Sequence, residues 1–132
     1  MKITADTNVL ARAILQDDPL QCQAAQVSLK QATLIAVSLP SLCELAWILR
    51  RGARLSKQDT AIAIRALFDT GNVVMNRPAV EAGLAVLQAG GDFADGVIAH
   101  EGKWLGGETF VSFDRKAIDL LAAQGQATKL LQ

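Results

Sequence analysis

The chain has 132 residues, of which 51% are hydrophobic and 20% charged, and its 13 basic and 13 acidic side chains balance. This composition predicts a single folded domain over residues 1–132 and excludes a disordered chain. The longest uncharged run, residues 31–43, is too short to span a membrane, and the start lacks a signal-peptide pattern, so we expect a cytoplasmic protein without membrane contact. Zero net charge gives no support for a nucleic-acid partner, although a local basic strip or a metal ion would suffice to bind one.

The predicted elements alternate short apolar runs with longer helical patterns. In chain order they are a strand at 2–5, helices at 7–15 and 20–32, a strand at 33–38, helices at 39–52 and 56–71, a strand at 72–76, helices at 77–91 and 92–107, a strand at 108–113 and a helix at 114–125. We expect the second helix to start at Asp18–Pro19, the fourth to be capped by Ser56, and the sixth to unravel at Gly102. The alternation predicts an α/β fold, a three-layer α/β/α sandwich around a central, mainly parallel sheet.

Four acids occupy matching places in this order of elements. Asp6 and Asp114 each follow a predicted strand, Glu44 lies one turn into the helix after the second strand, and Asp95 lies in the first turn of the 92–107 helix. In a parallel α/β fold these positions share the edge beyond the carboxyl ends of the strands. Clustered carboxylates repel unless a cation neutralises them, and Mg²⁺ or Mn²⁺ prefers such oxygen ligands. The pattern therefore predicts metal-assisted hydrolysis of a phosphodiester.

Each acid also has a purely structural interpretation as part of a helix start. The candidate caps are Asp6, Asp92, Asp114 and a capping box formed by Ser41 and Glu44. Against this interpretation, the residues three and four positions after Glu44 and after Asp95 are apolar or small. Both acids are therefore expected to face the core, where an unpaired carboxylate is unfavourable without a ligand.

Four segments together resemble a known family. "ADTNVLAR", "LCELAWIL", "GGDFADGVIA" and "FVSFDRKA" are similar, in order and across nearly the whole chain, to the signature segments of the PIN domain, and most closely to those of VapC-type toxins. The resemblance implies a metal-dependent ribonuclease whose acidic pocket holds Mg²⁺ or Mn²⁺. It also implies inhibition by a small VapB-like antitoxin, a homodimer, and contact with DNA only through the antitoxin.

The resemblance assigns roles to individual residues. Asp6, Glu44, Asp95 and Asp114 match the four metal-binding acids of the family, and Asp92 matches a position of auxiliary acids. The supporting positions are Thr7, Asn8 and Ser112, with Asn8 expected to orient Asp6. One departure is Gly96, where alanine is usual, and we expect it only to loosen a helix turn slightly.

Other features have weaker functional interpretations. Arg50, Arg51, Arg115 and Lys116 are candidate RNA contacts, although basic residues at a helix end are usually only solvated. Trp47 is expected in the core or a dimer interface, and His100, the single histidine, at the solvent edge of a helix end.

Two other functions stay open from the sequence. One is a catalytically silent PIN-fold binding module. The other is an Mg²⁺-dependent domain that forms a phospho-aspartate, although "DTN" lacks the second acid that such domains place after their first strand.

Overall fold

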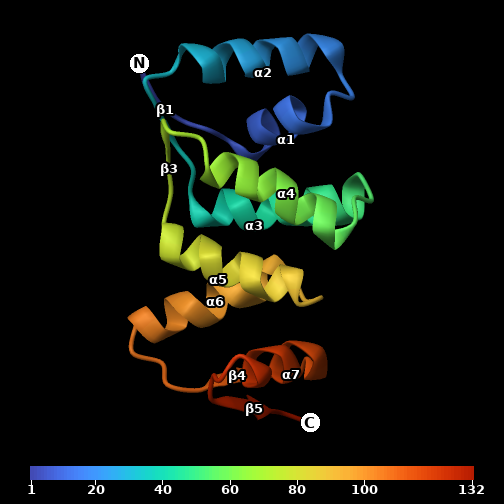
Figure 1. Ribbon diagram of the computed structural model, residues 1–132, viewed down its shortest axis with the longest axis vertical. Helices are drawn as coiled ribbons and strands as arrows, with labels where there is room; N and C mark the ends of the chain where they lie inside the picture. The colour runs from blue at the N-terminus through green and yellow to red at the C-terminus, as the bar shows by residue number, and fades with distance from the viewer. The chain divides into compact units, whose positions relative to one another are not determined.

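The computed structural model describes residues 1–132, which form α-helices, a π-helix and short β-strands (Figure 1). The chain divides into two compact units, Met1–Asn76 and Arg77–Gln132, and each is described by itself. The expected mixed α/β composition is confirmed, and every strand pairing is parallel. The strands lie in two small sheets, one in each unit, and the three-layer sandwich stays a prediction.

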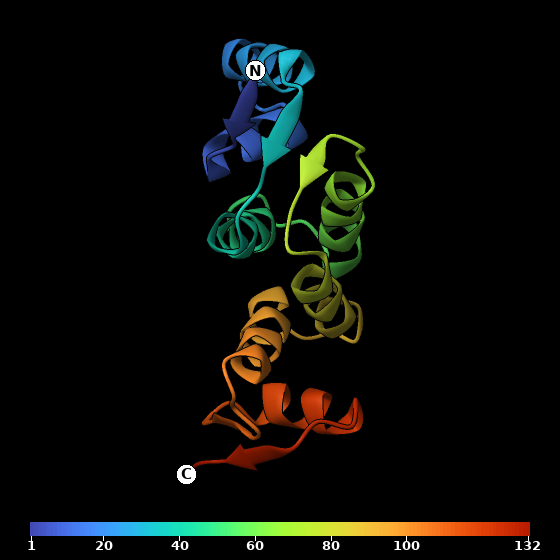
Figure 2. The same ribbon diagram turned by 90° about the vertical axis from the view of Figure 1, so that its left-hand side faces the viewer.

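The first unit contains a three-stranded parallel sheet in the order β1-β2-β3. β1 (Lys2–Thr4) pairs with β2 (Leu34–Ala36), and β2 pairs with β3 (Val73–Val74), so β2 is the central strand. Figure 2 shows β1 and β2 as dark blue and cyan arrows that lie side by side. Because parallel strands end at the same edge of a sheet, the helices that follow β1 and β2 begin at one common edge.

Two helix starts in the first unit are those predicted. α1 (Thr7–Leu15) and α2 (Pro19–Gln31) connect β1 to β2, and the Asp18 carboxylate accepts a hydrogen bond from the Gln21 amide at 3.1 Å at the start of α2. In α4 (Lys57–Phe68) the Ser56 hydroxyl accepts a bond from the Asp59 amide at 2.9 Å. These caps confirm both predictions and satisfy amide groups that a helix leaves unpaired.

α3 (Leu39–Trp47) begins where predicted, but its N-cap lies three residues before the candidate cap Ser41. Ser38 is the N-cap, and its hydroxyl accepts a hydrogen bond from the Ser41 amide at 3.3 Å. The predicted capping box of Ser41 and Glu44 is therefore wrong, because Ser41 already lies inside the helix. This N-cap places Glu44 in the second turn, beyond the reach of a capping role.

A π-helix, η1 (Ile48–Gly52), continues α3. It ends at Gly52, as predicted, and Arg54 follows in a left-handed conformation with φ of 58°. Arg50 Nη1 donates a hydrogen bond to the Leu55 carbonyl at 2.6 Å, which ties the widened turn to the segment after it. π-Helical turns are uncommon and frequently accompany functional positions.

The second unit contains three helices and a pair of parallel strands. The elements are α5 (Arg77–Gln88), α6 (Phe93–Trp104), β4 (Phe110–Ser112), α7 (Arg115–Ala123) and β5 (Thr128–Leu130). β5 is absent from the predicted elements. Buried Val86, Ala99 and Leu121, with Phe110 and Leu120 packed against them, join α5, α6, α7 and β4 in one core.

α6 differs from its prediction at two glycines. The helix runs through Gly102 to Trp104, so the predicted unravelling at Gly102 is wrong, and Gly106 follows its end with φ of 103°. At Gly96 the helix lies directly on α5: an added Cβ would stand 2.8 Å from the Ala82 carbonyl carbon and from the Gly83 Cα. Gly96 therefore permits close packing of two backbones, one residue after Asp95.

None of the helices has the length and apolar character needed to cross a membrane.

Thr60 of α4 offers a test of the packing in the first unit. Its side chain is 0% exposed, and Oγ1 has no hydrogen-bond partner. A buried hydroxyl without a partner costs about 1–3 kcal/mol, so Thr60→Val is expected to raise the free energy of unfolding by about 1 kcal/mol. Urea unfolding followed by circular dichroism measures this change. Thr70→Val is the control and should give no gain, because the exposed Thr70 hydroxyl donates to the Ala66 carbonyl at 2.7 Å; equal gains would contradict the prediction.

Candidate functional site

Asp6 stands at the N-cap of α1, but its side chain does not cap the helix. Its backbone is extended, with φ of −70° and ψ of 154°, and the carboxylate makes no capping hydrogen bond. The side chain is exposed, whereas the adjacent Thr7 is 3% exposed and Asn8 is exposed. The structural interpretation of Asp6 as a cap therefore leaves its carboxylate unexplained, and a ligand role stays open to it.

Glu44 points away from the core, contrary to its prediction. The buried stripe of α3 and η1 consists of Leu42, Leu45, Ala46 and Leu49, at the spacing of one helix face. Glu44 falls outside this stripe and is exposed, and so is Trp47 one turn later, at 63% exposure. Apolar neighbours along the chain therefore do not mark a core-facing position here. Trp47 does not lie in the core, and its alternative place in a dimer interface stays a prediction.

Asp6 and the start of α3 lie at the same edge of the first sheet. The Ala5 amide donates to the Ala36 carbonyl at 3.0 Å, so the chain leaves β1 and β2 at adjacent points. α1 begins directly after Asp6 and α3 after Ser38, and the two helices contact each other. Helix N-termini carry partial positive charge, so this edge favours anionic groups.

In the second unit, the surroundings of the Asp95 carboxyl disfavour its charged form. It lies in the first turn of α6 and is half-buried. Burial raises the pKa of the Asp95 carboxyl, and the charges of Asp92 and then Asp114 raise it further. The negative charges of Asp92 and Asp114 therefore both act on Asp95, and a cation nearby would relieve this repulsion.

Asp92 and Asp114 both stand at N-caps but differ in how their side chains are used. Asp92 makes no side-chain capping bond in α6. Asp114 Oδ1 accepts hydrogen bonds from the amides of Lys116 at 3.0 Å and Ala117 at 3.2 Å, which leaves Oδ2 free of capping bonds. The Ser112 hydroxyl accepts a bond from the Asp114 amide at 2.9 Å, so Ser112 supports the backbone of that acid.

Asp114 caps α7 through Oδ1 and is also a candidate metal ligand, and two substitutions are expected to distinguish these roles. Asp114→Ala removes the cap of α7 and is expected to lower the free energy of unfolding by about 1 kcal/mol. Asp114→Ser keeps an oxygen that accepts the same amide bonds and is expected to leave stability nearly unchanged. Thermal unfolding of both variants in EDTA measures the difference. Equal losses in the two variants would show that the carboxylate stabilises α7 other than by capping.

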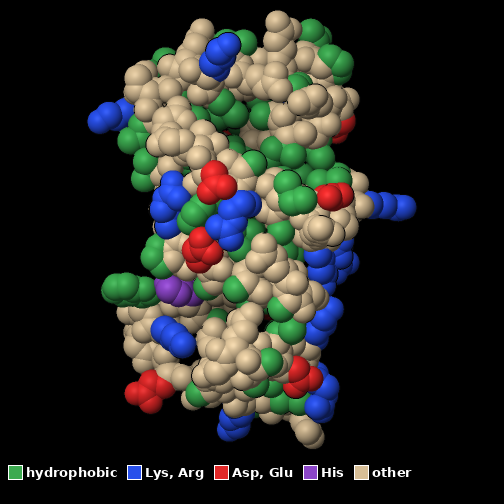
Figure 3. All heavy atoms as spheres, viewed as in Figure 1, with side chains coloured by type: hydrophobic (Ala, Val, Ile, Leu, Met, Phe, Trp, Pro, Cys, Tyr) green, Lys and Arg blue, Asp and Glu red, His purple; other side chains and the backbone are tan.

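The basic candidates are not equivalent. Arg50 is partly buried, and its guanidinium bonds to the Leu55 carbonyl, so its side chain has a structural role. Arg51, Arg115 and Lys116 are exposed and remain candidate phosphate contacts. Acidic, basic and hydrophobic side chains are interspersed on the face drawn in Figure 3.

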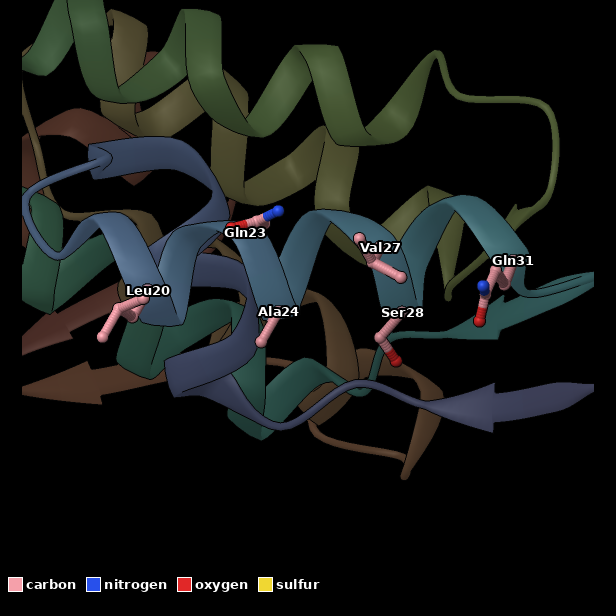
Figure 4. A pocket seen from close by; sticks show the side chains of 6 residues that line it. All are labelled: Leu20, Gln23, Ala24, Val27, Ser28 and Gln31. Atoms are coloured by element: carbon pink, nitrogen blue, oxygen red, sulfur yellow. The ribbon is translucent and has the colours of Figure 1, made fainter.

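His100 of α6 is the single histidine of the chain. His100 is partly buried, and its Nε2 atom is buried without a hydrogen-bond partner, so the expected solvent-edge position is only partly correct. A shallow pocket lies along one length of α2 (Figure 4) and contains no titratable group; it is lined by Leu20, Gln23, Ala24, Val27, Ser28 and Gln31.

The acids have the chemistry that a hard divalent cation prefers. Carboxylate oxygens suit Mg²⁺ and Mn²⁺, and the raised pKa of Asp95 marks a place where positive charge would be stabilising. No group of three or more His, Cys, Asp or Glu side chains is arranged to hold a metal ion. Two residues near the acids have surroundings that the sequence did not predict. Gly96, beside Asp95, lies against the backbone of α5, and Trp47, one turn after Glu44, is exposed.

The chain matches no protein-family model, no curated protein and no solved structure.

Proposed function

We propose that the chain is a Mg²⁺-dependent endoribonuclease of the PIN-domain type, acting as the toxin of a toxin–antitoxin pair. The observation that carries the proposal is Asp95, a half-buried carboxyl whose pKa is raised by its burial and then by the charges of Asp92 and Asp114. Such an arrangement is unfavourable for a protein without cations and favourable for one that binds them. The resemblance of four sequence segments to VapC-type toxins supplies the reaction class and the three-layer PIN-like architecture.

In this mechanism the four predicted carboxylates, Asp6, Glu44, Asp95 and Asp114, hold Mg²⁺, with Mn²⁺ as a substitute. Bound Mg²⁺ supplies a Lewis acid that lowers the pKa of water and stabilises negative charge on a departing oxygen. Asp114 would offer the metal a carboxylate whose Oδ2 makes no capping bond, because the two amides at the start of α7 bond to Oδ1. Asp6 contributes a carboxylate that no capping bond occupies.

The remaining residues bind RNA and position the acids. Arg51, Arg115 and Lys116 are exposed and supply positive charge for phosphates of the RNA. Ser112 holds the backbone at Asp114, and Gly96 lets α6 pack on α5 so that Asp95 keeps its place. The proposed partners are RNA, a small VapB-like antitoxin and a second copy of the chain in a homodimer, with DNA reached only through the antitoxin and the cytoplasm as the place of action.

The proposal is tested by incubating the purified chain with RNA in Mg²⁺, in EDTA, and after Mg²⁺ is restored to the EDTA sample. Cleavage is expected only in the first and third conditions, and Asp6→Asn is expected to abolish it without loss of fold, because that side chain does not cap α1. Cleavage in EDTA would contradict the metal mechanism. An acid-stable, base-labile phosphoprotein would indicate phospho-aspartate chemistry instead, and RNA binding without any cleavage would indicate a silent binding module.

A further inference from the structure

Arg54 stands where the fold favours glycine. It follows η1 with φ of 58°, a left-handed conformation that is unfavourable for a residue with a Cβ. Three other helices of the chain are followed by a glycine with positive φ: Gly90 after α5, Gly106 after α6 and Gly125 after α7. Gln16 after α1 is the other exception, and its side chain is neutral. Arginine therefore makes the turn after η1 less stable than glycine would.

The conformation of Arg54 is imposed by hydrogen bonds on both sides of it. Before it, the Ala53 amide donates to a carbonyl of η1 at 2.9 Å. After it, the Leu55 amide donates to the Leu49 carbonyl at 2.8 Å, and the Leu55 carbonyl accepts the bond from Arg50 Nη1 at 2.6 Å. Arg54 therefore cannot relax to an ordinary φ while these bonds are kept, and strain held in this way is a reason to look for a function.

The Arg54 side chain contributes no bond within the chain that would offset this strain. Its guanidinium is exposed, and neither it nor the exposed guanidinium of Arg51 makes a hydrogen bond or an ion pair. Residues 45–58 contain no acid, and their basic members are Arg50, Arg51, Arg54 and Lys57. A chain of zero net charge therefore gathers positive charge in this segment, with two cations directed to solvent.

Building on the proposed function, we infer that Arg51 and Arg54 bind phosphates of the RNA backbone, on a turn that Arg50 holds in place. A guanidinium presents several N–H donors in one plane, which match the oxygens of a phosphate. The proposed substrate carries a phosphate at each nucleotide, so two arginines of one turn can each meet one. Phosphate contacts do not read the bases, so the turn supplies affinity for RNA without a sequence preference.

An acidic segment of a protein is the competing ligand, because carboxylates also pair with guanidinium groups. Between the two arginines lie exposed Gly52 and partly buried Ala53, so the turn itself offers no large apolar anchor. Protein interfaces of high affinity depend on such anchors, whereas binding to RNA phosphates depends on charge alone. The turn therefore fits RNA better, and the two ligands give different results in the experiment below.

The experiment measures the Kd for a fluorescein-labelled, mixed-sequence single-stranded RNA by anisotropy, in EDTA and over a range of KCl concentrations. Each phosphate contact to a single strand contributes about 0.7 to the slope of log Kd against log salt. Arg54→Gly and Arg51→Gln are each expected to lower the slope by about 0.7, or about fivefold in Kd over a tenfold range of salt. Arg54→Lys keeps the charge and should keep the slope.

Lys30→Gln is the matched control and should leave the slope unchanged. Lys30 is exposed on α2 of the same unit, and it is the only basic residue between positions 13 and 49. A slope that falls equally in Lys30→Gln and Arg54→Gly would show that only the total charge matters, and it overturns the inference. Unchanged slopes in both arginine variants overturn it as well. If those variants instead weaken binding of a labelled oligo-glutamate peptide, the turn belongs to an acidic protein segment.

Stability separates a binding role of Arg54 from a structural one. Arg54→Gly is expected to unfold at a higher urea concentration than the parent while it binds RNA more weakly, because glycine adopts the left-handed conformation without strain. Arg54→Lys should unfold like the parent, since lysine also carries a Cβ. Lower stability of Arg54→Gly would mean that the arginine side chain serves the fold, and this result overturns the inference.

The inference and the proposed function fail separately. A protein that never cleaves RNA but whose salt slope falls in Arg54→Gly refutes the nuclease and retains the phosphate-binding turn. A protein that cleaves RNA in Mg²⁺, with the same salt slope in the parent and in Arg54→Gly, retains the nuclease and refutes the turn.

Discussion

Asp95→Asn is expected to lower Mg²⁺-dependent RNA cleavage by at least about 100-fold while the chain stays folded, since even the loss of an outer metal partner costs about 10–100-fold. The amide keeps the shape of the side chain but supplies no negative charge at the centre of the three-acid group. Initial rates at saturating Mg²⁺, with circular dichroism as the check of folding, measure the effect. Asp119→Asn, at an exposed acid of α7, is the control and should leave the rate unchanged.

The same variant is expected to be more stable than the parent when no metal is bound. The pKa of the Asp95 carboxyl is raised above its ordinary value of 3.8 by burial, then by Asp92 and Asp114, so ionisation is harder in the folded chain than in the unfolded one. A raised carboxyl pKa means that stability is lost as pH rises from the ordinary pKa through the folded pKa, and stays lost at neutral pH. Asparagine does not ionise and escapes this loss.

Thermal unfolding in EDTA from acidic to neutral pH measures the prediction. The variant is expected to unfold at a higher temperature than the parent near neutral pH, and the difference should disappear in acid, where Asp95 is protonated in both states. Adding Mg²⁺ should raise the unfolding temperature of the parent, because a ligand of the folded state stabilises it, and should affect the variant less. Equal stabilisation of both proteins by Mg²⁺ would place the cation away from Asp95.

The sequence predicted most helices because their starts have local chemical signals. Asp18 before Pro19 and Ser56 before an acidic first turn act through bonds within a few residues, so their roles do not depend on distant contacts. β5 carries no comparable signal: Thr128–Leu130 is short and contains a charged residue, and its pairing with β4 is a long-range contact. Gly102 misled the prediction because one glycine in an exposed helix costs only about 1 kcal/mol, which neighbouring turns can offset.

The candidate site was predictable in its residues but not in their surroundings. Asp6 and Asp114 both precede a helix, and only the hydrogen bonds show that Asp114 caps while Asp6 does not. For Glu44, the buried face of α3 depends on which residues meet α1 and α4, so its exposure could not be derived from its neighbours along the chain. Gly96 is the strongest example, because the need for glycine comes from Ala82, fourteen positions earlier in sequence.

Gly96→Ala is expected to lower the free energy of unfolding by about 1–3 kcal/mol, the usual cost of overpacking a close contact. An added Cβ at this position meets the carbonyl group of Ala82 and the Cα of Gly83, and these are backbone atoms that cannot rotate away as a side chain can. Alanine favours a helix over glycine by about 1 kcal/mol, so the clash must exceed this gain for the prediction to hold. Urea unfolding measures the sign and the size of the change.

Gly102→Ala provides the matched control, because it is the same substitution in the same helix with open space around the new Cβ. Only helix propensity acts there, so Gly102→Ala is expected to raise stability by up to about 1 kcal/mol. Opposite signs for the two variants would establish that the contact between α5 and α6, and not helix propensity, requires glycine beside Asp95. Two gains of similar size would mean that the helices separate at little cost; the place of the Asp95 carboxylate would then not depend on this contact, and the proposed role of Gly96 in positioning it would be lost.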